Sequence, residues 1–141
     1  MPPEVDLEHE KRLADLLVAG VAAGAIASAH DVADGGLAVA LAECCFTGPV
    51  RVGARVELLD SLRPDALVFG ESTGRVVVAT ADAKQLLALA AQHGIKACRV
   101  GTTGGERLAI GPAGARPWID EPVDALHAIW AGAIPRRLRE G

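Results

Sequence analysis

A chain of 141 residues is long enough to bury a hydrophobic core, and its net charge of −4 argues against the basic face that nucleic acid binding requires. Half of its residues are hydrophobic but only 3% are aromatic, so the core has to be built from Ala, Val, Leu and Ile. The longest apolar run, 37–46, is interrupted by Glu43 and is far shorter than the roughly 20 residues that cross a bilayer. We therefore expect one domain over 1–141, without nucleic acid or membrane partners.

The three cysteines, Cys44, Cys45 and Cys98, do not have the spacing of metal ligands. Two of them are adjacent, so their side chains leave a helix in different directions. The chain opens with Met-Pro-Pro-Glu and then charged residues, which is unlike a signal peptide. These features predict buried free thiols in a reducing, cytoplasmic compartment, and no metal site.

Apolar residues at helical spacing predict a first helix over 6–23, with Asp6 as its N-cap. A strand is expected over 25–30. It is followed by a helix over 35–47 that is apolar nearly all round and therefore buried. Alternation of apolar and charged residues then predicts a half-buried strand over 50–58.

Two short apolar runs, 66–69 and 75–80, are predicted to be strands, and the five polar residues between them fit a hairpin loop or a functional turn. Asp82 is expected to cap the next helix, over 83–92, with Leu86, Leu87, Leu89 and Ala90 facing inward.

A second hairpin is predicted from strands at 95–100 and 107–110, with a glycine-rich turn between them. A last helical region starts at Trp118 and is interrupted at Pro135. Trp118 and Trp130 are expected to be packing anchors. Helices and strands are mixed without strict alternation, which predicts an α+β fold with a mixed β-sheet covered by helices.

The polar bend at 28–37 carries His30, Asp31, Asp34, Gly35 and Gly36 between a strand and a helix. Free amide groups and the helix dipole favour an anion at such a junction, and adjacent glycines allow close approach. Asp34 is a candidate helix cap. The two aspartates repel a bare phosphate, so a phosphate here would need a cation as well. Close packing of helix on strand would use the same glycines, and the pattern alone leaves both interpretations open.

The second polar bend, 70–75, offers a carboxylate in Glu71, hydroxyls in Ser72 and Thr73, and a guanidinium in Arg75. Arg75 has the planar donor geometry that binds phosphate or carboxylate, and Glu71 can accept hydrogen bonds or ligate a metal. The same residues are also ordinary components of a polar turn.

Taken together, the two bends resemble the C-terminal domain of the aminoimidazole ribonucleotide synthase-related proteins. The His-Asp-x-x-Asp-Gly-Gly-Leu sequence at 30–37 is typical of that superfamily. Its continuation to Glu43 and the Gly-Glu-Ser turn at 70–72 favour one member, phosphoribosylformylglycinamidine synthase.

The resemblance implies a ligase of purine biosynthesis. That enzyme converts formylglycinamide ribonucleotide to the amidine, using ATP, Mg²⁺ and ammonia from glutamine. The chain would be the last α/β domain of a larger synthase subunit, partnered by the remaining domains, a glutaminase and a small accessory subunit. The family's catalytic histidine loop lies in other parts of the subunit, so no catalytic residue is expected here, and the isolated domain is expected to be inactive.

The resemblance also marks candidate substrate- or nucleotide-binding residues. They are His30, Asp31, Asp34, Gly35, Gly36, Glu71, Ser72, Thr73 and Arg75. Thr73 stands where the family's first repeat has Gln, which favours the second-repeat copy. Three alternatives are aminoimidazole ribonucleotide synthase, a hydrogenase maturation factor and a non-catalytic docking domain. We expect both bends to converge on one rim, and exposed apolar surface to permit self-association.

Overall fold

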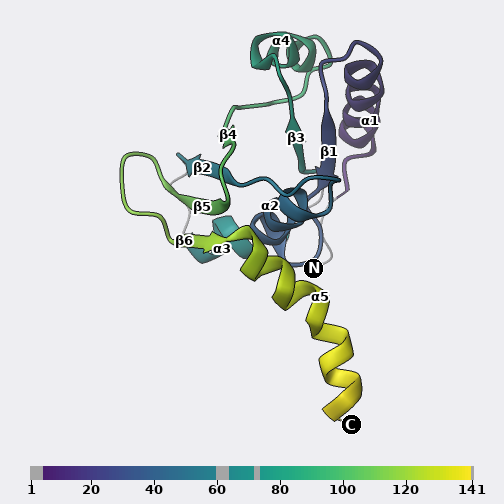
Figure 1. Cartoon of the computed structure of the whole chain (residues 1–141). Helices are drawn as coiled ribbons and strands as arrows, with labels where there is room; N and C mark the ends of the chain where they lie inside the picture. The colour runs from purple at the N-terminus through teal and green to yellow at the C-terminus, as the bar shows by residue number, and fades with distance from the viewer. Residues whose placement is uncertain (1–4, 60–63, 72–73, 141) are drawn as a thin grey trace. The chain divides into compact units, whose positions relative to one another are not determined.

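The computed structural model describes residues 5–59, 64–71 and 74–140 (Figure 1). The backbone divides into two compact units, one formed by 1–40 and 68–99 and the other by 41–67 and 100–141. Two helices continue from one unit into the other, α2 (Gly36–Phe46) and α3 (Pro64–Phe69).

The first unit pairs two helices with a two-stranded sheet. Its complete elements are α1 (Leu7–Ala22), β1 (Ser28–Asp31), β3 (Val76–Ala79) and α4 (Ala83–Gln92). The strands are antiparallel, and α1 and α4 contact each other (Figure 1). The core of this unit is aliphatic: buried Ala25, Ile26 and Leu86, with half-buried Leu17 and Val78 packed against them. The expected strand at 25–30 therefore begins three residues later, because Ala25 and Ile26 enter the core before the pairing starts.

Both expected aspartate caps are confirmed. Asp6 accepts a 3.0 Å hydrogen bond from the N–H of His9, and Asp82 accepts one of 3.0 Å from the N–H of Gln85. Each carboxylate satisfies an amide that has no partner inside its helix. Helix α4 consequently begins and ends at the predicted residues. Leu86 and Ala90 are buried as predicted, but Leu87 is 38% exposed and does not face inward.

The second unit contains a mixed four-stranded sheet in the order β4-β2-β5-β6, followed by a long helix. The elements are β2 (Ala54–Leu58), β4 (Gly101–Thr103), β5 (Arg107–Pro112), β6 (Ile119–Pro122) and α5 (Val123–Glu140). Strands β2 and β5 are parallel, and the other neighbours are antiparallel. The predicted α+β class with a mixed sheet is confirmed. The sheet's buried side chains are Val56, Leu58, Leu108 and Ile110.

Residues 66–69 are not a strand, because they belong to helix α3. Proline is favoured at the first helical position and an acid in the first turn, and Pro64 and Asp65 occupy these places. Strand β3 consequently has β1 as its partner, and the hairpin predicted across 70–74 is wrong.

The strand predicted at 95–100 is also wrong, since β4 begins at Gly101. The N–H of Ile95 bonds to the carbonyl of Ala90 and so completes the end of α4. The predicted hairpin between this strand and β5 does not form, because β2 lies between β4 and β5 in the sheet. The predicted strand at 50–58 is shortened to β2, and Val50 is 75% exposed. Before the strand starts, the N–H of Val52 bonds to the carbonyl of Cys45.

The C-terminal region differs from prediction in three ways. Strand β6 precedes the last helix, and the N–H of Trp118 bonds to the carbonyl of Ile110. Helix α5 continues through Pro135. Trp118 is 41% exposed, which is more than expected of a packing anchor, whereas Trp130, although 52% exposed, packs against the rings of Phe46 and His127 as predicted.

The thiols are free, as predicted, but they are not all buried. Cys45 is buried, Cys44 is half-buried and Cys98 is exposed. The prediction of buried thiols is therefore wrong for Cys98, which lies in the irregular segment between α4 and β4.

Candidate functional site at two converging bends

The two polar bends meet in the first unit. The N–H of Gly35 donates a 3.0 Å hydrogen bond to Oε1 of Glu71. Beside it, the N–H of Val32 donates a 2.9 Å bond to the carbonyl of Arg75, which extends the β1–β3 pairing into the bends. The predicted convergence of the two bends is confirmed.

The adjacent glycines bring the backbones of the bends together. Gly35 and Gly36 have φ angles of 84° and 72°, which L side chains rarely adopt. A Cβ on Gly36 would lie 2.6 Å from the carbonyl carbon of Phe69 and 2.9 Å from the carbonyl oxygen of Gly70. Gly36 is buried, so its open face is filled by the second bend. This close approach is what the packing interpretation of the glycines predicts.

The start of α2 carries its own counter-charge. The first amides of a helix attract anions, and here a carboxylate oxygen of Glu71 already occupies that position at Gly35. Asp31 and Asp34 are exposed nearby, and α2 begins at Gly36, so Gly35 rather than the predicted cap Asp34 directly precedes the helix. A phosphate approaching this helix end would have to displace one carboxylate and face two others.

The other predicted site residues make local contacts or lie outside the described residues. The ring of His30 is half-buried, and its Nδ1 donates a 2.7 Å hydrogen bond to the carbonyl of Asp31. Arg75 is half-buried, and its carbonyl belongs to the strand pairing. Ser72 and Thr73 lie outside the described residues.

The described residues do not form a complete protein site for the magnesium ion that the resemblance implies. Within 5–59, 64–71 and 74–140, no group of three or more His, Cys, Asp or Glu side chains could hold a metal ion. The helix end that could receive a phosphate is engaged by Glu71.

Among the described residues, no helix has the length and apolar character to span a membrane.

A polar and aromatic cluster in the second unit was missed by the sequence analysis. Arg51 donates to Oδ1 of Asp124 at 2.5 Å and to Nδ1 of His127 at 2.9 Å. The ring centroid of Phe46 lies 5.4 Å from that of His127 and 5.3 Å from that of Trp130. The three-residue spacing of Asp124, His127 and Trp130 on one helix was the available signal. This cluster joins the start of α5 to the end of α2.

Comparisons with known proteins show the family of the chain. Residues 1–111 match the family described as "AIR synthase related protein, C-terminal domain". The chain is 38% identical over 139 residues to phosphoribosylformylglycinamidine synthase subunit PurL of Thermomicrobium roseum, and 40% identical over 136 residues to that of Moorella thermoacetica. These alignments cover 94% and 95% of this chain but only 18% of each relative.

The fold is likewise found in a solved structure of the same kind of protein. Phosphoribosylformylglycinamidine synthase II of Thermotoga maritima matches with a TM-score of 0.76 and 23% sequence identity. The match covers 88% of this chain and 22% of that one. The chain thus spans about a fifth of the length of the proteins it resembles, and it belongs to the AIR synthase related protein, C-terminal domain, family.

Proposed function

We propose that this chain is the C-terminal AIR synthase-related domain of a phosphoribosylformylglycinamidine synthase of the PurL type. That ligase uses ATP and glutamine-derived ammonia to convert formylglycinamide ribonucleotide to formylglycinamidine ribonucleotide in purine biosynthesis. The observation that carries the proposal is the 38–40% identity to PurL subunits across 94–95% of the chain. It favours this member over aminoimidazole ribonucleotide synthase and the hydrogenase maturation factors.

Within that enzyme, we propose that the two bends of this chain have a structural role and do not bind substrate. The engagement of Glu71 with Gly35 and the packing of Gly36 on the second bend support a structural use of the two bends. The named complexes of the Thermotoga maritima protein include ATP, ADP and FGAR. In our proposal, ATP and Mg²⁺ are held mainly by parts of the synthase outside this chain, and the isolated chain is inactive.

The proposed partners follow from the same assignment. The Thermotoga maritima protein has also been solved as PurLQS. By analogy, we propose that the remaining synthase domains, a glutaminase and a small accessory subunit assemble with this chain in the cytoplasm.

A reconstitution assay tests the proposal. The chain is mixed with a PurL subunit from which the matching region has been removed, and formylglycinamidine ribonucleotide formation is followed with ATP, Mg²⁺ and ammonia. We expect no turnover from either part alone and activity from the mixture. The matched control replaces the truncated PurL with an aminoimidazole ribonucleotide synthase that lacks its C-terminal domain, with ring closure as the readout. Activity only in the control, or turnover by the chain alone, would contradict the proposal.

A further inference from the structure

Arg51 joins the segment between α2 and β2 to the start of α5. Its guanidinium donates to Oδ1 of Asp124, and its Nη2 lies 2.9 Å from Nδ1 of His127. A guanidinium has five N–H donors and no acceptor, so Nδ1 of His127 has to accept this bond. The contact therefore requires a neutral ring whose proton lies on Nε2.

The ring of His30 is in the opposite situation. Its Nδ1 lies 2.7 Å from the carbonyl oxygen of Asp31, which can only accept. Nδ1 of His30 is therefore the donor, and this bond survives when the other ring nitrogen takes up a proton. Protonation of His127, in contrast, places a second N–H donor and a second positive charge against the guanidinium of Arg51. The two rings should thus respond differently to pH.

A replacement partner for a protonated His127 lies on the same helix. Asp124 precedes it by three residues, so the two side chains share one face of α5. The carboxylate of Asp124 accepts from Arg51 and is 80% exposed, which leaves it room to accept a second donor. A carboxylate bonds more strongly to a charged imidazole than to a neutral one. Protonation therefore favours a bond between His127 and Asp124.

The neighbouring elements carry few other charges. Helix α2 contacts the ring of His127 through Phe46, and its one charged residue is Glu43. Strand β6, which precedes α5, carries Asp120 and Glu121. Asp120 is paired with a different arginine, Arg107.

We propose that His127 is a pH-sensitive latch on α5. When its ring is neutral, Arg51 is held by both His127 and Asp124, and it ties segment 47–53 to the helix. When the ring is protonated, it repels the guanidinium and takes the carboxylate of Asp124, so Arg51 is released. The change is an exchange of partners, and its direct readout is the local state of Arg51. This inference does not depend on the proposed function.

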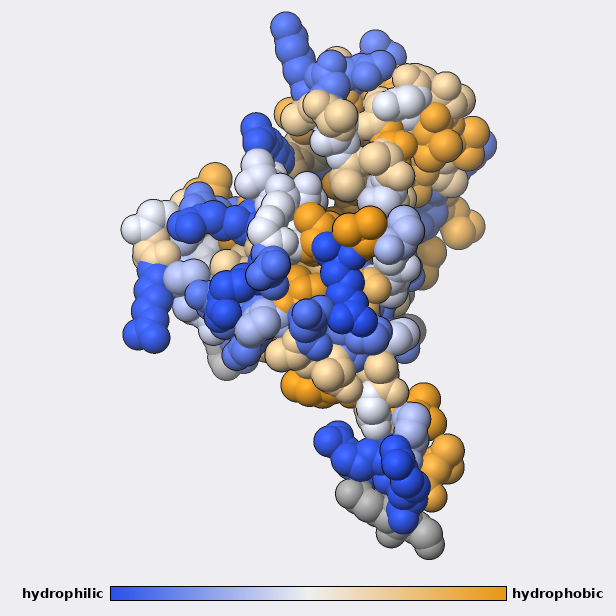
Figure 2. Space-filling model, viewed as in Figure 1, coloured by the Kyte–Doolittle hydropathy of each residue, from blue (hydrophilic) through white to orange (hydrophobic). Residues whose placement is uncertain are grey.

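The latch acts on the part of α5 that is covered. Val123, at the start of the helix, is 2% exposed, whereas Ile134 and Leu138 are 72% and 78% exposed. Figure 2 shows the last turns of α5 with apolar surface on one side and strongly hydrophilic surface on the other. The contacts of its first turns therefore hold the helix, and release of Arg51 removes one of them.

Nitrogen NMR of the chain with labelled histidine rings tests the protonation states. In the neutral form, we expect His127 to carry its proton on Nε2 and His30 to carry its proton on Nδ1. The shifts of the two nitrogens of each ring distinguish these forms. A neutral His127 with its proton on Nδ1 would overturn the inference, because that ring could not accept from Arg51.

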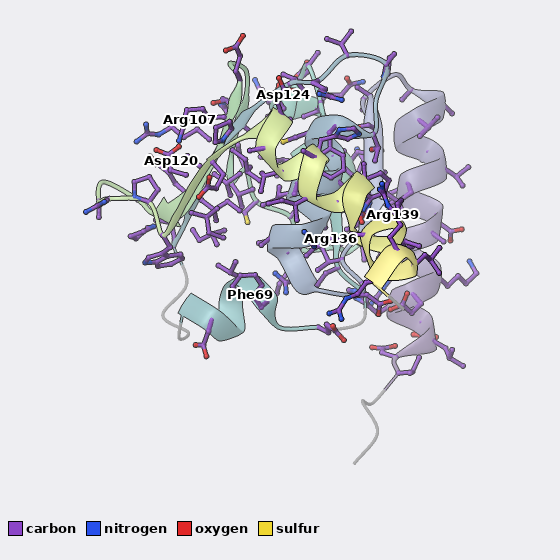
Figure 3. The ribbon with its side chains drawn as sticks, turned by 60° about the horizontal axis from the view of Figure 1, so that its bottom comes forward. Phe69, Arg107, Asp120, Asp124, Arg136 and Arg139 are labelled. Carbon is purple, nitrogen blue, oxygen red and sulfur yellow. The ribbon has the colours of Figure 1, made fainter. Side chains whose placement is uncertain are left out.

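The release of Arg51 is measured by NMR as rotation of its terminal Nη groups. We expect this rotation to become about tenfold faster between about pH 8 and about pH 5, where imidazoles take up protons and two exposed hydrogen bonds would be lost. The matched control is Arg107, which lies beside Asp120 (Figure 3). Its Nε and Nη2 donate to Asp120 without a histidine, so its rotation should not change.

The substitution His127→Gln separates the charge of the ring from its hydrogen bond. The amide oxygen of Gln can accept from Arg51 but does not titrate. In this variant Arg51 should stay held at both pH values. The matched control is His93→Gln at the end of α4, which should leave the pH response of Arg51 unchanged. Two-dimensional NMR spectra establish that both variants remain folded.

Three further results would overturn the inference. One is a wild-type chain in which the rotation of Arg51 does not change relative to that of Arg107. Another is a pH response that persists in His127→Gln, which would assign it to a carboxylate such as Asp124. The third is an equal loss of the response in His93→Gln.

Discussion

Gly35 and Glu71 are 36 residues apart in the chain, yet the N–H of Gly35 donates a 3.0 Å hydrogen bond to Oε1 of Glu71. The bond joins the start of α2 to the bend that follows α3. A carboxylate at a helix N-terminus compensates the partial positive charge of the amides there. Glu71 therefore stabilises the bend pair in the way that a bound anion would.

Replacing Glu71 should weaken the first unit. We expect Glu71→Ala to lower the free energy of unfolding by about 1–2 kcal/mol, because a charge-assisted hydrogen bond and a helix counter-charge are both lost. Glu71→Gln should cost less, since its amide oxygen can still accept from Gly35. Urea denaturation measures the difference. The control is Asp34→Ala, whose carboxylate is exposed at the same turn. A larger loss for Asp34→Ala than for Glu71→Ala would show that Asp34 caps the helix.

Gly36 should be the least replaceable glycine of the bends. Gly36→Ala places a Cβ 2.6 Å from the Phe69 carbonyl carbon, at a φ of 72°. Gly24→Ala is the matched control, because Gly24 has a φ of 70° and nothing within 4 Å of the added Cβ. The control should lose about 1–2 kcal/mol from backbone strain alone. Gly36→Ala should lose roughly 2 kcal/mol more, because main-chain atoms must move. Thermal unfolding measures both losses of stability. If Gly36→Ala and Gly24→Ala lose the same free energy of unfolding, the two bends can move apart with little loss of stability, and the prediction is wrong.

Local signals were sufficient to predict the starts of α1 and α4. Asp6 and Asp82 are predictable as caps because each is an aspartate directly before an apolar pattern with helical spacing, and each accepts from the amide three residues on. The segments at 66–69 and 95–100 were assigned wrongly because a short apolar run has no measurable period. Strand partners are set by contacts between distant segments. Local patterns therefore do not indicate that β2, rather than β4, lies beside β5.

The candidate site was predictable in outline but not in its contacts. Convergence of the bends followed from the resemblance of 30–37 and 70–72 to one family. The Gly35–Glu71 bond was not predicted, because spacing alone does not distinguish a ligand loop from a packed one. Arg51 was missed for a similar reason, since its partners Asp124 and His127 are 73 and 76 residues away.

The stabilisation of α1 by its N-cap Asp6 should be lost at acid pH. The hydrogen bond from the N–H of His9 lowers the pKa of Asp6 below its ordinary value of 3.8. The stabilisation is therefore fully present above that ordinary pKa and is lost as the pH falls through the lowered one. Carboxyl carbon shifts in an NMR titration report the Asp6 pKa directly. The control is Asp6→Asn, whose side chain does not titrate. In this variant, protection of the first-turn amides of α1 from exchange should no longer fall as the pH passes through the Asp6 pKa. Titration of Asp6 at or above 3.8 would contradict the cap.

The three thiols should react at very different rates. Burial, followed by the neighbouring Cys44, raises the pKa of Cys45 to about 11, and burial together with Glu43 raises the pKa of Cys44. At pH 8 only about one Cys45 in a thousand is then a thiolate, which is the reactive form. Cys98 is exposed. We expect iodoacetamide to modify Cys98 first, then Cys44 and last Cys45, as followed by mass spectrometry of peptides. Unfolding in urea is the control and should make the rates similar. Rapid labelling of Cys45 in the folded chain would mean that α2 opens locally, since neither its burial nor its raised pKa permits fast reaction in the closed state.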